Sequence, residues 1–340
     1  MDRNSFTSDS KIPLGFLAFL GITILVYFLI TSNNAFWQFC EEYTPVREGD
    51  NLRFESNLRL LDNDSSKKIV FVGRSTTREG FDMNYLRSVN GKKDISFYNL
   101  GYAAASTFEI YTRRGILLKE NSVVVYMLPS SEFERKIDYD KLREYAGLES
   151  IPLLIDAFGT IIITTHFNDL TEIYLGNIFV FYRHRADLVR LTKDILQSIA
   201  KTESLQKQKN FRYDNALPQT NTTEKTKKTV TKNNTNLYEY QIGLLELFLQ
   251  EAKNKNCQVI IVDEPQRYLT KLTKNKLNNQ TFREILLAEQ KKYGFKYLQV
   301  EDLPRFDTND FYDSVHLLKK GRDKLTKRIN AYLSANGLYN

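Results

Sequence analysis

The chain has 340 residues, of which 42% are hydrophobic, a formal net charge of +7 and a sequence pI of about 9.1. This length suits one large domain with an insertion or two smaller domains, and the apolar content is enough to bury a sizeable core. A basic chain suits lipid headgroups, nucleic acid or acidic polymers, but charge alone does not choose among them. The two cysteines, Cys40 and Cys257, lie too far apart for a disulfide framework or a cysteine-based zinc motif.

The first predicted element is an uncharged apolar segment near the N-terminus. From Ile12 to Ile30 the sequence reads IPLGFLAFLGITILVYFLI, which is close to the ~20 residues that a helix needs to cross a bilayer. We therefore predict a transmembrane anchor over residues 12–31. Arg3 and Lys11 precede it, and basic residues favour the cytoplasmic side, so residues 1–11 are expected inside and the remainder in the periplasm or exterior. A cleaved signal peptide is the alternative, although its apolar region is normally shorter.

Five short apolar runs follow, after residues 32–66, which we interpret as a polar connector. The runs are KIVFVG, DISFYNLG, SVVVYML, CQVIIV and FKYLQV, and each predicts a strand. Capping boxes at Ser106–Glu109 and Thr281–Glu284 predict helix starts, and an i,i+4 apolar pattern predicts a last helix after His316. Alternating strands and helices predict an α/β fold with a doubly wound parallel sheet, in a flavodoxin-like three-layer arrangement, over residues 67–340.

A helical insertion is predicted over residues 151–236, between the third and fourth strands. Its first part, up to about Ser198, is apolar and aromatic and ends in an amphipathic helical pattern. Three placements of this part are possible from the sequence: it packs against the core, it covers the rim of an active site, or it lies on the bilayer. Residues 201–236 are polar and rich in Lys, Asn and Thr, which predicts a mobile loop.

The first strand ends abruptly in Gly73-Arg74-Ser75. Reactive groups in open parallel sheets gather at the carboxyl ends of strands. A nucleophilic serine needs a tight strand-to-helix turn, where backbone N–H groups at the helix start can stabilise an oxyanion. Ser75 therefore is a candidate nucleophile, and the alternative is an ordinary polar turn.

A candidate base lies near the C-terminus, in the sequence YDSVHLLKKG. Asp313 precedes His316 by three residues, so one short loop can supply both an imidazole and the acceptor that fixes its tautomer. The other two histidines lack such a neighbour. His166 is interpreted as structural and His184 as a surface residue on an amphipathic helix.

Together these motifs resemble those of the SGNH (GDSL-like) hydrolase superfamily, over roughly Lys67 to Leu333. In that resemblance Ser75 matches the nucleophile, Gly101 in YNLGYAAAS matches the second-block glycine, and Asp313 and His316 match the last block. The anchored architecture is similar to an envelope group that includes the D-alanyl-transfer protein DltD and the alginate O-acetylation accessory proteins.

The sequence departs from the superfamily pattern at two places. Arg74 stands where many members have Asp, and the third block, LPSSE, lacks the usual Asn. The resemblance implies oxyanion donors from the backbone of Ser75 and Gly101. Either Ser130 or Ser131 replaces the missing amide, or the oxyanion hole is poorer.

Two arginines flank the candidate nucleophile. Arg74 and Arg78 either clamp an anionic substrate group or form an ordinary surface pair. The DEPQRY stretch, residues 263–268, also follows a strand and either lines the cleft or forms a turn.

The resemblance implies an exported, membrane-anchored serine esterase or O-acyltransferase that needs no cofactor and no metal. The expected partners are the lipid bilayer, an acylated envelope lipid or polymer as substrate, and envelope-assembly proteins. The alternative is a catalytically inactive scaffold of the same fold, which the missing third-block amide favours. Nucleic acid is not an expected partner, because much of the basic excess lies in residues 201–236.

Overall fold

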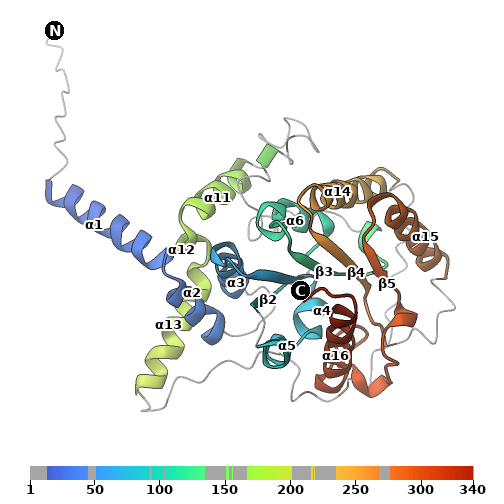
Figure 1. Ribbon diagram of the computed structural model, residues 1–340. Coiled ribbons are helices and arrows are strands. Elements are labelled where there is room, and N and C mark those ends of the chain that lie inside the picture. Colours follow the sequence, from blue (N-terminus) through green and yellow to red (C-terminus); the bar gives the residue numbers. More distant parts are fainter. Residues whose placement is uncertain are drawn as a thin grey trace, which may run out of the picture.

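Five strands pair into one parallel sheet at the centre of the computed structural model (Figure 1). The structure describes residues 14–44, 51–91, 94–102, 105–134, 167–200, 235–267 and 276–339, together with positions 151, 152, 155, 216 and 218. The strands are β1 (Lys67–Gly73), β2 (Ile95–Gly101), β3 (Val123–Leu128), β4 (Gln258–Asp263) and β5 (Lys296–Leu298). Their order, β2-β1-β3-β4-β5, is one of the two common orders of doubly wound sheets. The predicted α/β fold with a parallel sheet is confirmed.

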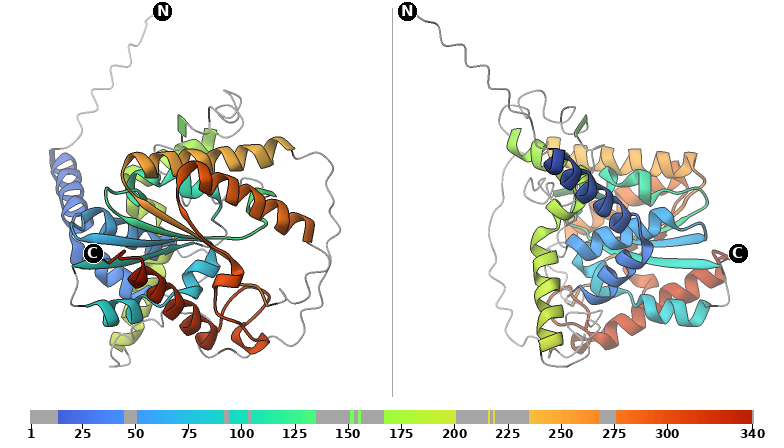
Figure 2. Two further views of the ribbon diagram at one scale, coloured as in Figure 1. Left: turned by 45° about the vertical axis from the view of Figure 1, so that its right-hand side comes forward. Right: turned by 90° about the vertical axis from the view of Figure 1, so that its left-hand side faces the viewer.

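Helices cover both faces of this sheet, which makes the three layers (Figure 2). One face carries α3 (Asn51–Asn63), α6 (Thr107–Thr112), α7 (Arg114–Leu117), α14 (Thr235–Asn254) and α15 (Lys276–Tyr293). The other carries α4 (Ser75–Gly80), α5 (Met83–Asn90) and α16 (Lys319–Ala335). Because both faces are buried, the strands are continuously apolar rather than alternating.

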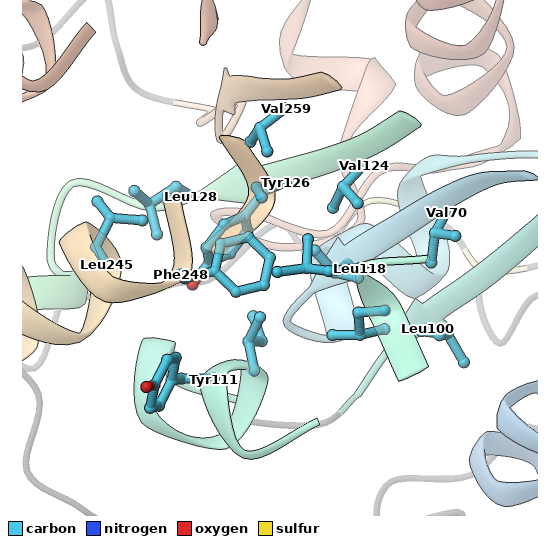
Figure 3. Close-up of a cluster of buried hydrophobic side chains, with 14 of the residues drawn as sticks. Val70, Leu100, Tyr111, Leu118, Val124, Tyr126, Leu128, Leu245, Phe248 and Val259 are labelled. Carbon is cyan, nitrogen blue, oxygen red and sulfur yellow. The ribbon is translucent and has the colours of Figure 1, made fainter. Parts of the chain in front are cut away.

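Successive strand residues point to opposite faces and so enter two separate cores. Val70 and Val124 lie in the core beneath α14, beside Tyr126 and Phe248 (Figure 3). Phe71 lies in the other core with the apolar side chains of α16.

Helix starts were only partly predicted. The capping box at Ser106 is present, with the Ser106 N–H donating to Glu109 Oε2 at 2.8 Å. The helix that it starts is short, because α6 ends at Thr112 and α7 follows. The box predicted at Thr281 is wrong, since α15 already begins at Lys276.

Residues 32–66 are not a simple connector, because they contain the helices α2 (Asn34–Tyr43) and α3. Phe54, Leu58 and Leu61 of α3 are buried in the core beneath α14. Trp37 and Cys40 of α2 are fully buried, in a third cluster. The intervening charged and amide residues of α3 masked its apolar spacing in the sequence.

The N-terminal helix α1 (Leu14–Thr31) has apolar side chains that are largely exposed from Phe19 to Ile30. Within the described part of the chain, no one helix has the length and apolar content expected of a membrane span. One pair of helices has them together, Phe19–Thr31 followed after a 68° bend by Asn34–Tyr43.

The described part of the insertion is helical, as predicted, with α11 (Phe167–Ile178), α12 (Val180–Arg183) and α13 (Arg185–Ala200). Ile173 packs on the core, and Val180 and Leu191 join the cluster around Trp37. His184 is not a surface residue, because it is 2% exposed and lies 3.9 Å from the buried Glu55 carboxylate. His166 and residues 201–234, apart from positions 216 and 218, lie outside the described residues.

Candidate active site

The end of β1 places Ser75 at the first position of α4. Gly73 has a φ of +144°, and a Cβ there would lie 2.2 Å from Thr77 Oγ1 and 2.7 Å from the Met127 carbonyl oxygen. Only glycine fits this close approach. The chain therefore turns sharply into α4, and the N–H of Ser75 falls in the first helical turn, where amides lack an intrahelical acceptor.

Asp313 and His316 lie on a loop that its own backbone closes. The Tyr312 N–H donates to the His316 carbonyl at 2.8 Å, and Phe311 and Leu317 form an antiparallel bridge. Asp313 Oδ1 accepts the N–H groups of Val315 and His316 at 2.9 and 2.8 Å. These bonds orient the carboxylate before any contact with the rest of the molecule is considered.

The structure brings the three predicted residues into one chain of hydrogen bonds. Ser75 Oγ lies 2.9 Å from His316 Nε2, and His316 Nδ1 lies 2.7 Å from Asp313 Oδ2. An ionised carboxylate can only accept, so it holds the proton on Nδ1 and leaves Nε2 as an acceptor for the serine hydroxyl. This arrangement can deprotonate Ser75 as it attacks an electrophile.

Burial opposes the charge of Asp313, but the hydrogen bonds from the side chain and backbone of His316 and from the Val315 N–H outweigh it. The pKa of Asp313 is lowered to about 2. Asp313 is thus ionised near neutral pH, as the orienting role requires. The side chains of His316 and Asp313 are 18% and 24% exposed, so small molecules can reach the site.

Glu264, which lies in the DEPQRY stretch directly after β4, is a buried neighbour of the site. Its Oε1 accepts the hydroxyl of Thr76 at 2.5 Å, and Thr76 follows the candidate nucleophile. Burial raises the pKa of Glu264, although the Thr76 hydrogen bond and the charge of Arg74 oppose this. Asp263 binds Tyr297 and Val300 instead, and the Arg267 N–H donates to the Ser314 carbonyl. The stretch after β4 thus contacts both segments that carry the candidate catalytic residues.

The two flanking arginines do not act as a pair. Arg74 Nη2 lies 2.5 Å from Glu132 Oε2, and Glu132 Oε1 accepts the Thr107 N–H at 2.7 Å. Arg78 Nε instead lies 3.1 Å from Glu79 Oε1. Glu132 is 1% exposed, so Arg74 neutralises a buried carboxylate and does not form the surface pair with Arg78 that was one of the two alternatives; a role in binding an anionic substrate group stays a prediction.

The backbone N–H of Gly101, which the resemblance places in the oxyanion hole, already has a hydrogen-bond acceptor in this structure. It donates to Asn99 Oδ1 at 3.0 Å, which removes it from the oxyanion hole. A glycine is needed at position 101 for a different reason, since a Cβ there would lie 2.2 Å from the backbone nitrogen of Arg78 in α4. Ser130 and Ser131 lie in the turn after β3, half-buried and exposed respectively, and their role as donors stays a prediction.

No family model matches the chain, and a search of curated proteins found no match. Within the described ranges, no group of three or more His, Cys, Asp or Glu side chains is arranged to hold a metal ion.

Proposed function

We propose that this protein is a membrane-anchored serine acyl-ester hydrolase or O-acyltransferase of the SGNH type. The observation that carries the proposal is the hydrogen-bonded chain Ser75–His316–Asp313, which joins residues 241 positions apart in sequence. It is supported by the place of Ser75 at the carboxyl edge of a parallel sheet, where such sheets bind their ligands.

In the proposed mechanism, Ser75 Oγ attacks the carbonyl carbon of an ester while its proton passes to His316 Nε2. The tetrahedral intermediate collapses, and the leaving alcohol takes the proton from Nε2, which leaves an acyl group on Ser75. Water or an acceptor hydroxyl then attacks the acyl carbonyl, and His316 accepts the incoming proton and returns it to Ser75 Oγ. Asp313 stabilises the imidazolium in both halves of the reaction.

The oxyanion would be stabilised by the N–H of Ser75, with Ser130 or Ser131 as further candidate donors. Gly101 could contribute only after releasing Asn99. Since one such donor is worth on the order of 10²–10³ in rate, we expect slow turnover of simple esters.

Support for membrane anchoring comes from α1. Large apolar side chains such as Phe19, Ile22 and Leu29 are more than half exposed. Exposed apolar area costs about 25 cal/mol per Å² in water, and hydrocarbon removes that cost. Tyr27 Oη donates to the Ile178 carbonyl at 3.1 Å and accepts the Val180 N–H at 2.6 Å, which fixes the end of α1 to the insertion. We propose a cytoplasmic N-terminus, an exported α/β domain and substrates among the acyl esters of envelope lipids or polymers.

The second candidate function is an inactive scaffold of the same fold that binds envelope polymer or assembly proteins. It is favoured by the engagement of the Gly101 N–H and by the lack of an amide side chain after β3.

Labelling with a fluorophosphonate probe distinguishes the two functions, because only an activated serine reacts with it. The full chain is solubilised in detergent, and labelling and p-nitrophenyl acetate hydrolysis are measured in parallel. Ser75→Ala should abolish both, whereas the control Ser88→Ala, on the exposed surface of α5, should retain both. Absence of labelling in the unaltered chain would favour the scaffold, and labelling that survives in Ser75→Ala would remove Ser75 from the mechanism.

A further inference from the structure

The insertion contacts α1 at the short break between α11 and α12. Phe179 forms this break, and its ring centroid lies 6.1 Å from that of Tyr27 in α1. The ring of Phe181 in α12 lies 5.0 Å from the same tyrosine ring. Tyr27 precedes Thr31, the last residue of α1, by one helical turn, which is about 6 Å along the helix axis. The break therefore lies at the level of the last turn of the predicted anchor.

The side chains at this level are apolar and yet exposed. Ile178 and Phe179 are exposed at the break, and so are Phe28 and Leu29 in the last turn of α1. A bilayer surrounds a spanning helix on all sides, so residues level with the last turn of α1 would lie at the same depth. If α1 crosses the bilayer, the break lies where the acyl chains meet the headgroups, a layer in which aromatic side chains are common.

The helix α13, which follows the break, is also apolar on its exposed surface. One side of α13 packs in the cluster around Trp37. The rest of the helix exposes three large apolar side chains, which are Val189 (68% exposed), Leu196 (61%) and Ile199 (70%). Exposed apolar groups gathered on one element commonly mark a surface that contacts a protein or a membrane.

The charges on this surface favour an anionic partner. The exposed residues of α13 include Arg185, Arg190 and Lys193, and none of them is acidic. Arg190 Nη1 lies 3.3 Å from Asp187 Oδ1, so the apolar side chains define this surface and the basic ones select its partner. Apolar side chains combined with basic ones are typical of helices that lie in the interface of an anionic bilayer.

The outer surface of α13 and the anchor lie on the same side of the molecule. Tyr27 of α1, Phe181 of α12 and Leu188 of α13 all pack in the cluster around Trp37. Figure 1 shows α1, α12 and α13 together to the left of the sheet, with the axis of α13 running across that of α1. A helix that runs across a membrane anchor at its end lies along the membrane surface.

We infer that the insertion rests on the surface of an anionic bilayer, with Phe179 immersed beside the last turn of α1 and the exposed surface of α13 against the headgroups. The inference rests on the proposed membrane anchoring and adds a second region of lipid contact to it. It is independent of the chemistry proposed at Ser75. A single spanning helix leaves a domain free to tilt, whereas this second contact would hold the α/β domain in one orientation above the membrane.

The test places a nitrobenzoxadiazole fluorophore on engineered cysteines of the full chain in lipid vesicles. Val189→Cys and Leu196→Cys report on α13, and Leu25→Cys, at an exposed position of α1, reports on the anchor. Leu287→Cys is the matched control, at an exposed leucine of α15 outside the insertion.

The vesicles contain phosphatidylcholine, with or without phosphatidylglycerol, and with or without a lipid that carries a nitroxide quencher. The native Cys40 and Cys257 are buried, so the unaltered chain measures the background labelling. Thermal unfolding checks that each labelled chain is folded.

An interfacial helix lies roughly 5–10 Å into the boundary between headgroups and acyl chains, so the nitroxide lipid should lower the fluorescence at positions 189 and 196 by about half or more. Position 25 should also be quenched, and position 287 should be unaffected. Omitting phosphatidylglycerol should weaken the quenching on α13 but not at position 25, because basic side chains are attracted to anionic headgroups.

Quenching at position 25 without quenching at positions 189 and 196 would overturn the inference and leave the proposed anchor in place. Labels on α13 that neither the nitroxide lipid nor aqueous iodide quenches would show that protein covers this surface, which also overturns it. Equal quenching of α13 in both lipid compositions would refute the preference for an anionic bilayer. Lack of quenching at position 25 would refute the anchor and the inference together, whereas fluorophosphonate labelling of Ser75 is a separate result.

Discussion

Replacing Asp313 with Asn tests the proposed mechanism most directly. The Asn oxygen can still accept the N–H groups of Val315 and His316, which now bind Oδ1. The other side-chain atom becomes an NH₂ donor facing His316 Nδ1, 2.7 Å away. The imidazole would then carry its proton on Nε2, where it cannot accept one from Ser75.

The expected loss of rate is far larger than the loss of stability. A pKa lowered from an ordinary 3.8 to about 2 corresponds to about 2.4 kcal/mol, which solvent screening of this partly exposed group reduces to about 1–2 kcal/mol. That stabilisation is present above pH 3.8 and is lost as the pH falls through about 2. The wrong tautomer costs about 10⁴-fold in rate in comparable triads. A folded protein with almost no activity is therefore expected.

The assay compares fluorophosphonate labelling rates and p-nitrophenyl acetate turnover for the unaltered chain and Asp313→Asn, with urea unfolding to measure stability. Asp323→Asn serves as the control, since Asp323 pairs only with Lys319 on the surface of α16 among the described residues. If Asp313→Asn retained a tenth or more of the unaltered rate, the carboxylate would not orient the base, and the reasoning would be refuted.

Two further predictions concern Glu264 and Gly101. Burial raises the pKa of Glu264, so its ionisation costs stability as the pH rises from the ordinary 4.5 through the raised value. Urea unfolding of Glu264→Gln should therefore show a gain in stability relative to the unaltered chain at pH 8 that is smaller or absent at pH 4.5, and parallel pH profiles would contradict this. Gly101→Ala should lower the free energy of unfolding by about 3 kcal/mol, because the new Cβ would overlap the backbone of Arg78. Gly115→Ala, whose Cβ would meet no atom within 4 Å, should cause no loss, and equal effects of the two substitutions would show that the clash is relieved.

The strands and the three-residue site could be predicted because their signals are local. Continuous apolar runs predict buried parallel strands, and the positions of Ser75 and of the Asp313–His316 pair follow from where elements end. The contacts that sequence reasoning missed depend on which strands are neighbours. Arg74 forms an ion pair with Glu132 only because β1 lies next to β3, and the order of the strands in the sheet cannot be inferred from any one segment of the sequence.

The assignment of Gly101 shows a different limit. A glycine after the second strand suggested a free N–H, but Asn99 lies two residues earlier and its side chain accepts that N–H. Asn side chains commonly accept a hydrogen bond from the backbone two residues later, so the pattern N-x-G could have predicted that the Gly101 N–H is engaged. The helix α3 was missed because its apolar residues are separated by charged and amide side chains that also suit an exposed segment.

The loop that carries Asp313 and His316 closes on itself through the Tyr312–His316 backbone bond and the Phe311–Leu317 bridge. The Asp313 carboxylate and the His316 imidazole would therefore move together if this segment shifted. Of the two hydrogen bonds in the candidate triad, the shift would break the 2.9 Å one between Ser75 Oγ and His316 Nε2. A movement of this loop relative to α4 would separate Ser75 from His316 while keeping the hydrogen bond between His316 and Asp313.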